Sequence, residues 1–288
     1  MSINIELNSA PSSLSLYWRV LTARKKGKID SSQGLLGEAR LNKVQCDPVR
    51  LANYRRTCGF SDDGYIPTSY PFVLGMPLQL SLLASDAFPF RVLGIVHVSN
   101  QITQYRPITA DELLDFHCTL SGPREANRGW EFDLHTQVTV QGTVVWESVC
   151  TMLRRDRTSQ RKPRKRAEKA TEFTPETISQ WPVPADTGRR YAGVSGDRNP
   201  IHLYAFTAKL FGFPRAIAHG MWTKARCLAE LQAITAGAPL DGRFSISAEF
   251  KRPLLLPAKA RFERAGNEFR VTTGGGRRVH LTGTLEAV

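Results

Sequence analysis

The chain has 288 residues, of which 41% are hydrophobic, and it carries a formal net charge of +13. This length can bury a substantial core in one large domain or in two domains of ordinary size. No run of about 18 apolar residues occurs, so we expect no transmembrane helix. The first residues show no positively charged stretch followed by an apolar one, which predicts a cytoplasmic protein and not a secreted one.

Cysteine and glycine patterns exclude several kinds of site. The cysteines are odd in number and never spaced as C-x-x-C, at positions 46, 58, 118, 150 and 227. This is typical of reduced thiols and not of a disulfide framework or a zinc site. The sequence also contains no P-loop and no G-x-G-x-x-G motif. We therefore expect no metal and no cofactor.

Apolar spacing predicts one helix and several strands in the first half, after an N-terminal extension over residues 1–48. Apolar residues at helical spacing predict a long helix over residues 71–84. Strands are expected at 91–98 and 102–105. Residues 130–140 alternate between apolar and polar side chains, and 143–149 form the returning strand after a Gln141-Gly142 turn.

A strongly basic segment separates the two halves. Residues 154–169 contain nine Lys or Arg and two acidic residues, a net charge of +7. The segment has no hydrophobic periodicity, so we interpret residues 154–175 as a solvated linker. Attraction of an acidic carrier protein, of coenzyme A phosphates or of nucleic acid is the functional alternative. No interleaved aromatic residues accompany the charges, so we expect no nucleic-acid partner.

The second half repeats the plan of the first. Met221, Ala225, Leu228 and Leu231 fall at helical spacing and predict one long helix over residues 217–235. Strands are expected at 244–250, 260–263, 268–273 and 278–285. An antiparallel sheet with a helix on one face is an α+β arrangement, and the sequence predicts it twice, without strong identity between the halves.

The most informative segment is YAGVSGDRNPIH at residues 191–202. It places the carboxylate of Asp197 five residues before the imidazole of His202, across a turn rich in Gly, Asn and Pro. Such a pair can move protons on and off carbon and oxygen. The alternative is a purely structural turn in which Asp197 caps the helix that follows. Ser195 does not lie in a G-x-S-x-G elbow, so a serine-hydrolase site is disfavoured.

The second segment of interest is IAHGM at residues 217–221. We interpret His219 as a core or capping residue. Gly220 stands at a predicted helix start, where free backbone N–H groups and the helix dipole can stabilise a developing oxyanion. A thioester enolate is such an oxyanion.

Together, these two segments and Gly212-Phe213 resemble the hydratase-2 motif of the MaoC-like family. This family contains (R)-specific enoyl-thioester hydratases and 3-hydroxyacyl-thioester dehydratases. The resemblance implies a double hotdog fold, with two long helices each wrapped by an antiparallel sheet. The first hotdog would span residues 49–153, shape the acyl-chain pocket and be catalytically silent. The second, catalytic hotdog would span residues 176–288.

The resemblance also implies the roles of individual residues. Asp197 and His202 would be the catalytic pair. Asn199, which would brace their loop, and Ser195 would contribute with Gly220 to oxyanion or substrate binding. The backbone N–H of Gly220 would hold the thioester carbonyl. Many family members carry Gly-Asp in the loop after the strand at 244–250, where this chain has LLPA at 255–258. We expect this departure to affect substrate preference more than chemistry.

The expected substrate is an acyl-CoA or an acyl carrier protein thioester. Because two hotdogs can pair within one chain, either a monomer or a homodimer is compatible with the sequence. Two alternatives of other classes remain: a hotdog thioesterase, and a non-enzymatic acyl-thioester binding module whose basic segment serves DNA binding.

Overall fold

The computed structural model describes residues 2–22, 34–86, 88–156, 173–235 and 242–288. Their strands form one sheet of order β1-β2-β4-β5-β6-β3-β8-β11-β10-β9-β7. The strands are β1 (Ile3–Leu7), β2 (Leu35–Val44), β3 (Ile95–Gln104), β4 (Leu114–Ala126), β5 (Gly129–Val140), β6 (Thr143–Arg155), β7 (Thr177–Val183), β8 (Phe244–Phe250), β9 (Ala258–Ala265), β10 (Glu268–Thr273) and β11 (Arg278–Ala287). Neighbouring strands are antiparallel, except that β1 and β2 are parallel.

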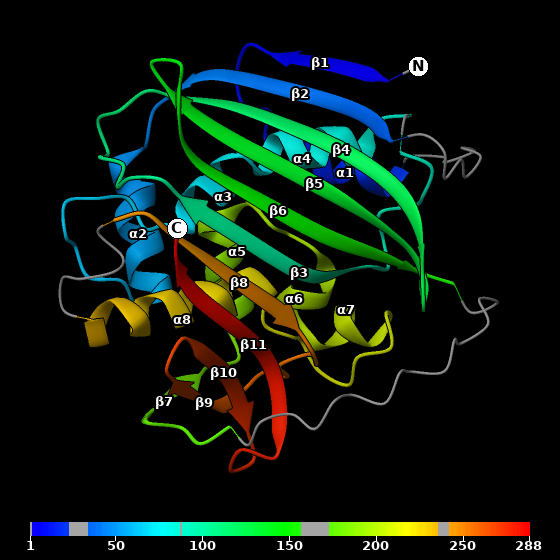
Figure 1. Ribbon diagram of the computed structural model, residues 1–288. Helices are drawn as coiled ribbons and strands as arrows, with labels where there is room; N and C mark the ends of the chain where they lie inside the picture. Colours follow the sequence, from blue (N-terminus) through cyan, green and yellow to red (C-terminus); the bar gives the residue numbers. More distant parts are fainter. Residues whose placement is uncertain (1, 23–33, 87, 157–172, 236–241) are drawn as a thin grey trace.

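The helices gather behind the strands in the view of Figure 1. They are α1 (Ser13–Thr22), α2 (Pro48–Cys58), α3 (Tyr70–Leu74), α4 (Met76–Ala84), α5 (Thr187–Ser195), α6 (Pro200–Leu203), α7 (Ala205–Lys209) and α8 (Gly220–Thr235). A large antiparallel sheet with helices on one face confirms the predicted α+β class. Among the described helices, none is long and apolar enough to cross a membrane.

The two halves of the sheet meet where β3 pairs with β8. In this antiparallel pair Gln101 lies opposite Ser247. Strands of the first half continue the sheet on the side of β3, and strands of the second half continue it on the side of β8. The chain therefore builds one continuous sheet from two similar halves.

The predicted hairpin at residues 130–149 is present as β5 and β6. The alternation is real, because Phe132, Leu134 and Val138 are fully buried. Gln141 and Gly142 both have positive φ angles, 49° and 78°. Two consecutive positive φ angles are typical of the tight turn whose twist matches that of a β-hairpin. The local sequence therefore suffices to place this element.

The helix predicted over residues 71–84 is divided into α3 and α4. The break lies at Gly75, and Pro77 stands in the first turn of α4. Proline has no N–H to donate to a carbonyl four residues earlier, and its ring clashes with that carbonyl. The prediction of one continuous helix is therefore wrong, although the buried face of the segment is as expected.

The two strands predicted at 91–98 and 102–105 form the single strand β3. Its pairing with β6 shifts register between His97 and Ser99, so that Val98 is an extra residue. A bulge of this kind reverses the alternation of side chains along a strand. The interruption of the sequence pattern therefore marks a bulge and not a gap between strands.

In the second half, β8 and β10 coincide with the predicted strands, and β9 and β11 extend beyond the predicted ends. α8 begins at Gly220, the predicted helix start, and ends at Thr235. In the first half, β2 falls inside the predicted N-terminal extension and pairs with β4. Most of the basic segment, residues 157–172, lies outside the described residues.

α2 and α5 occupy related positions in the two halves. Each ends at a glycine in the left-handed region, Gly59 with φ 80° and Gly196 with φ 83°. The rings of Tyr54 and Tyr191 meet where the helices pack, with centroids 6.2 Å apart. After these glycines the halves differ, because Phe60 follows Gly59 whereas Asp197 follows Gly196.

Candidate active site

The loop between α5 and α6 is fixed by its own polar groups. The Ser195 hydroxyl accepts a hydrogen bond from the Asp197 amide at 3.1 Å. Asn199 is the N-cap of α6, and its Oδ1 accepts from the Ile201 amide at 3.4 Å. Side-chain oxygens are typical acceptors for the free N–H groups at such a position. Ser195 and Asn199 therefore order the loop that carries Asp197.

The Asp197 carboxylate is held by donors on one side. Its Oδ1 accepts hydrogen bonds from the Tyr17 hydroxyl at 2.5 Å and from the Asn199 amide at 3.2 Å. Its Oδ2 lies 3.8 Å from Nε2 of His219. Burial alone would raise the pKa of Asp197, but the histidines His219 and His202 and the two donors outweigh burial and lower that pKa. The group is therefore a carboxylate at neutral pH.

His202 is a buried neutral imidazole with one free nitrogen. Its Nδ1 lies 2.8 Å from the carbonyl oxygen of Ile217, so Nδ1 donates the hydrogen bond. Burial lowers the pKa of His202, despite the opposing effects of Asp197 and of the Ile217 carbonyl. With the proton on Nδ1, the Nε2 atom keeps a lone pair and can accept a proton.

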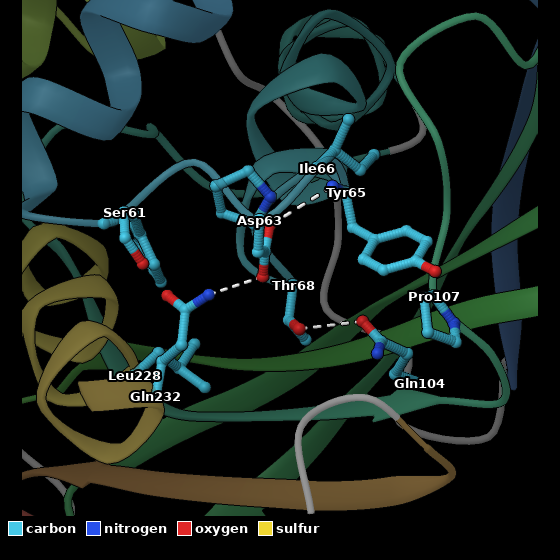
Figure 2. Close-up of a pocket in the computed structure, with 11 residues that line it drawn as sticks. Ser61, Asp63, Tyr65, Ile66, Thr68, Gln104, Pro107, Leu228 and Gln232 are labelled. Atoms are coloured by element: carbon cyan, nitrogen blue, oxygen red, sulfur yellow. Dashed lines mark hydrogen bonds between the residues drawn. The ribbon is translucent and has the colours of Figure 1, made fainter. Parts of the chain in front are cut away.

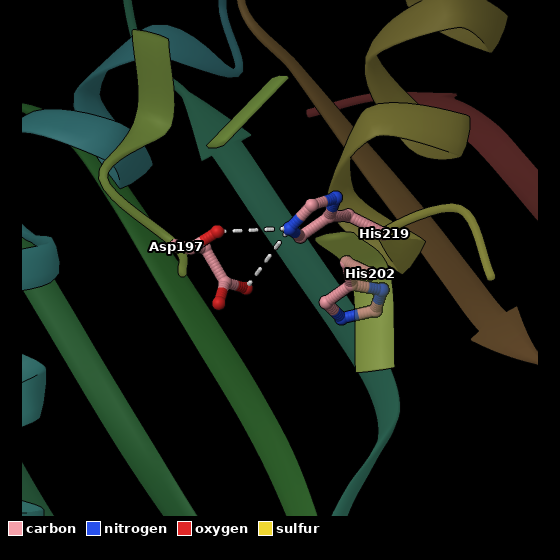
Figure 3. A group of neighbouring side chains, drawn as sticks. All are labelled: Asp197, His202 and His219. Carbon is pink, nitrogen blue, oxygen red and sulfur yellow. Dashed lines mark hydrogen bonds and ion pairs between the residues drawn. The ribbon is translucent and has the colours of Figure 1, made fainter. Parts of the chain in front are cut away.

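His219 lies against both members of the pair, as Figure 3 shows. Its ring stacks on that of His202 with centroids 3.7 Å apart, and its Nε2 donates to the Asp197 carbonyl oxygen at 3.0 Å. Burial lowers the pKa of His219 to about 3. A neutral ring wedged between backbone and side chain fits the predicted core role, but the sequence did not indicate that this ring contacts both Asp197 and His202.

Gly220 is the first residue of α8 and stands at the N-terminus of that helix. A Cβ atom at this position would lie 2.9–3.1 Å from the ring of Phe250. The close ring explains why glycine is needed here. The first amides of a helix have no acceptor within the helix, so the Gly220 N–H is a candidate donor to a ligand.

Tyr17 contacts the Asp197 carboxylate, and the sequence did not reveal this contact. It lies on α1, 180 residues before Asp197, in the predicted N-terminal extension. No motif surrounds it, and a single tyrosine on an amphipathic helix carries no signal of its own. The carboxylate contact depends entirely on how α1 packs.

The three side chains Asp197, His202 and His219 also satisfy a simple criterion for a metal site, because one donor atom of each lies within 4.8 Å of the others. A metal lies in the ring plane of each histidine that binds it. The two rings here are stacked, at an interplanar angle of 26°, so one ion cannot lie in both planes. This donor set does not fit a metal.

A separate cavity lies near the C-terminal part of α8 (Figure 2). Gln232 and Leu228 line it together with residues from the loop before α3, including Asp63 and Thr68. Its volume of about 30 Å³ suits about one water molecule. None of Asp197, His202 and His219 lines this cavity, so we place no chemistry there.

A family model described as "MaoC like domain" matches residues 158–282. The chain is also 39% identical over 221 residues to "3-hydroxyacyl-thioester dehydratase X" of Mycobacterium tuberculosis. The aligned region covers 76% of this chain and 77% of that protein. This chain belongs to the MaoC-like family. Membership makes it an enzyme of the hydratase and dehydratase class, a hydro-lyase, and sets aside the non-enzymatic binding module.

Solved structures of MaoC-like proteins have the same fold. The crystal structure of HtdX from Mycobacterium tuberculosis matches with a TM-score of 0.74 and 33% identity, over 87% of this chain and 100% of that chain. A MaoC-like dehydratase from Phytophthora capsici matches with a TM-score of 0.75 at 19% identity, over 90% of this chain and 98% of that chain. These likenesses confirm the predicted double hotdog fold.

Proposed function

We propose that this MaoC-like enzyme reversibly hydrates trans-2-enoyl thioesters to (R)-3-hydroxyacyl thioesters in fatty-acid metabolism, with Asp197 and His202 as its acid–base pair. The observation that carries the proposal is the cluster of a half-buried anionic carboxylate and a buried neutral imidazole with a free Nε2. The name of the 39% identical relative from Mycobacterium tuberculosis, a 3-hydroxyacyl-thioester dehydratase, supports a thioester as the substrate class.

In the hydration direction the pair activates one water molecule. Both the Asp197 carboxylate and Nε2 of His202 are acceptors in the resting state, so both can orient the same water. The pair takes one proton from the water as its oxygen attacks C3, and it returns one proton to C2. Dehydration runs the same steps in reverse. This cycle leaves the pair in its starting protonation state.

The α-proton of a thioester is too weakly acidic for either residue alone, so the enolate-like transition state needs a donor at the thioester oxygen. The Gly220 N–H at the start of α8 fulfils this role in our proposal. The dipole of the 16-residue helix α8 favours negative charge at this end. One such donor is typically worth about 3 kcal/mol of transition-state stabilisation.

In this proposal the first half lines the acyl-chain pocket and supplies no proton-transfer residue. Phe60 stands at the position that corresponds to Asp197, after the matching glycine Gly59. The ring of His97 on β3 lies between Phe72 and Phe250, with centroids 6.3 Å and 4.8 Å away. Because the Phe250 ring also lies close to Gly220, we infer that His97 and Phe72 of the first half border the acyl chain together with Phe250 on β8.

The thioester carrier in this proposal is coenzyme A or an acyl carrier protein. Both are anionic, and both would be attracted by the net charge of +13. The cytoplasm remains the predicted compartment, and monomer and homodimer remain the two predicted assemblies.

The test is turnover of trans-2-enoyl-CoA of several chain lengths, followed as loss of the conjugated thioester absorbance. Asp197→Asn and His202→Ala should each lower kcat at least about a hundredfold, since each removes a proton-transfer group. Asp111→Asn, at an exposed position, and His135→Ala, on β5, are matched controls that should keep the wild-type rate.

Near-normal turnover in both site variants would refute the assignment. Release of free thiol without loss of the double bond would instead identify a thioesterase. The solved structure of a 12:0-ACP thioesterase from Umbellularia californica matches this chain at 11% identity with a TM-score of 0.53, which is evidence for the fold alone. Formation of the (R)-3-hydroxy product would establish the hydratase.

A further inference from the structure

Tyr17 ties the N-terminal helix α1 to the loop of the candidate active site. Its hydroxyl donates to Oδ1 of Asp197 at 2.5 Å. Burial and the Asp197 charge raise the pKa of Tyr17, and the backbone N–H of Arg198 opposes them. The hydroxyl therefore keeps its proton and donates it in a hydrogen bond to the carboxylate.

α1 is anchored well enough to hold this hydroxyl in place. Leu16 and Val20, on either side of Tyr17 in the helix, are 1% and 5% exposed. The helix packs on α4 of the first half. The donor thus comes from outside the catalytic half, from an element whose own apolar residues are part of the core.

The hydrogen bonds divide the carboxylate into two unequal oxygens. Oδ1 is occupied by Tyr17 and by the Asn199 amide, whereas Oδ2 is the oxygen nearer the imidazole of His219. A carboxylate fixed at one oxygen cannot rotate about its Cβ–Cγ bond without losing both donors. The second oxygen is then available to a water molecule.

We propose that Tyr17 is a positioning residue for the reaction: it locks Oδ1 of Asp197 so that Oδ2 faces the substrate water. This inference rests on the proposed function of Asp197. Tyr17 acts through Asp197 and does not itself exchange a proton with the substrate, because its hydroxyl proton is committed to the carboxylate.

Tyr17→Phe keeps the ring and removes only the hydroxyl. A hydrogen bond to a charged group is strong enough that we expect kcat to fall about ten- to hundredfold. Substrate binding does not use the hydroxyl, so KM should stay within about threefold. The variant should therefore change kcat much more than KM. A general loss of structure would not produce this pattern.

The pH profile gives a second, independent measurement. Removing a donor from a carboxylate destabilises its charged form, so the acid limb of kcat should move to higher pH in Tyr17→Phe. The other titratable groups that act on Asp197 are Tyr191 on α5, His97 on β3, His202 on α6 and His219 before α8. All of them remain in the variant, so the difference from wild type reports Tyr17.

Tyr105 offers a matched control. Its hydroxyl also donates to a carboxylate at 2.5 Å, that of Glu147 on β6, and neither residue belongs to the candidate site. Tyr105→Phe should therefore leave kcat and the acid limb unchanged. The Tm of each variant is measured alongside to compare the folded states.

The outcomes separate this inference from the proposed function. A lower kcat and a shifted acid limb in Tyr17→Phe alone support the positioning role. Wild-type kcat and pH profile in Tyr17→Phe, with Asp197→Asn inactive, would overturn the role of Tyr17 and leave the hydratase intact. A change in KM alone would also overturn it. Turnover by Asp197→Asn would instead reject the catalytic assignment itself.

Discussion

At the scale of single residues, the candidate site is a cluster of neutral and anionic groups kept in fixed protonation states by burial and hydrogen bonds. His202 and His219 are buried and stacked, and the pKa of each is lowered by burial. Asp197 keeps its negative charge because His219, His202 and the Tyr17 and Asn199 donors together outweigh burial and lower its pKa. The resting site therefore contains one anionic carboxylate, two neutral imidazoles and no strong acid.

Gly220 gives a prediction at this scale. Gly220→Ala places a methyl group about where the Phe250 ring lies, since a Cβ would be 2.9–3.1 Å from that ring. We expect kcat to fall at least about tenfold, because the helix start or the ring must shift and a small displacement of a catalytic donor is costly. Initial rates with a trans-2-enoyl-CoA measure the effect.

The double variant Gly220→Ala/Phe250→Leu tests the cause. Alanine keeps the backbone N–H, so relief of the clash should restore part of the lost kcat. The single variant Phe250→Leu is the control, because it measures the effect on kcat of replacing the Phe250 ring alone. If the double variant is no more active than Gly220→Ala, the close contact with Phe250 does not explain the glycine.

At the scale of elements, α8 joins the two halves through a buried lysine. Lys224 is 0% exposed, and its Nζ donates to the carbonyl oxygens of Asn100 on β3 and Ile246 on β8, at 2.9 Å and 3.0 Å. A third hydrogen bond reaches Oδ1 of Asn100 at 2.6 Å. The three N–H donors of the ammonium group thus contact both β3 and β8, the strands through which the two halves of the sheet pair.

Lys224→Met should destabilise the protein at pH 7 by about 2–4 kcal/mol, because three buried acceptors lose their partner. Burial lowers the pKa of Lys224 to about 7, against about 10.4 in an unfolded chain. Between these values the unfolded chain holds the proton that the folded chain has released. The stability that Lys224 contributes therefore rises with pH, by up to about 1.4 kcal/mol per pH unit.

Urea denaturation of both proteins at pH 7 and pH 9 measures these effects. The difference in unfolding free energy between wild type and Lys224→Met should grow with pH. Lys251→Met, at a half-exposed lysine paired with Glu249, is the control and should show no such growth. An equal difference at both pH values would mean that Lys224 is charged throughout.

At the scale of the whole molecule, the first half contacts the second half, which carries the candidate site, at several points. Arg50 on α2 donates to the carbonyl oxygens of Val194 and Ser195 at 2.8 Å and 3.4 Å. Trp222 on α8 donates to the Thr57 carbonyl oxygen at 3.0 Å. With Tyr17, these contacts make the candidate site a product of both halves, although its motif lies in one.

Buried neutral histidines predict sensitivity to acid. Burial lowers the pKa of His97 to about 4, against about 6.5 in an unfolded chain. Between these values the unfolded chain binds a proton that folded His97 does not, so this contribution to stability is lost as the pH falls. His97→Phe should reduce the acid dependence by up to about 1.4 kcal/mol per pH unit.

Unfolding free energies between pH 7 and pH 4 test this prediction. The phenylalanine ring fits the stack between Phe72 and Phe250, so the variant should fold at pH 7. His135→Gln, at a partly exposed histidine on β5, serves for comparison. A slope in His97→Phe equal to that of wild type would show that other groups set the acid sensitivity.

Much of the fold follows from local sequence patterns. The alternation at 130–140, the Gln141-Gly142 turn and the apolar spacing of α8 depend on residues close together in the chain, so each element could be placed from its own segment. Predictions failed where one backbone feature interrupted a pattern. Pro77 interrupts the first-half helix. The bulge at Val98 interrupts the alternation within β3, so that one strand was predicted as two.

The sequence by itself determined which two residues lie at the centre of the candidate site. Asp197 and His202 are five residues apart, and local features, the left-handed Gly196 at the end of α5 and the N-cap Asn199 of α6, shape the loop that carries them. Only the tertiary structure decided what surrounds them. Tyr17, His97 and Lys224 act through contacts 100 residues or more along the chain. Such contacts depend on the pairing of β3 with β8 and on the packing of α1, which no local pattern encodes.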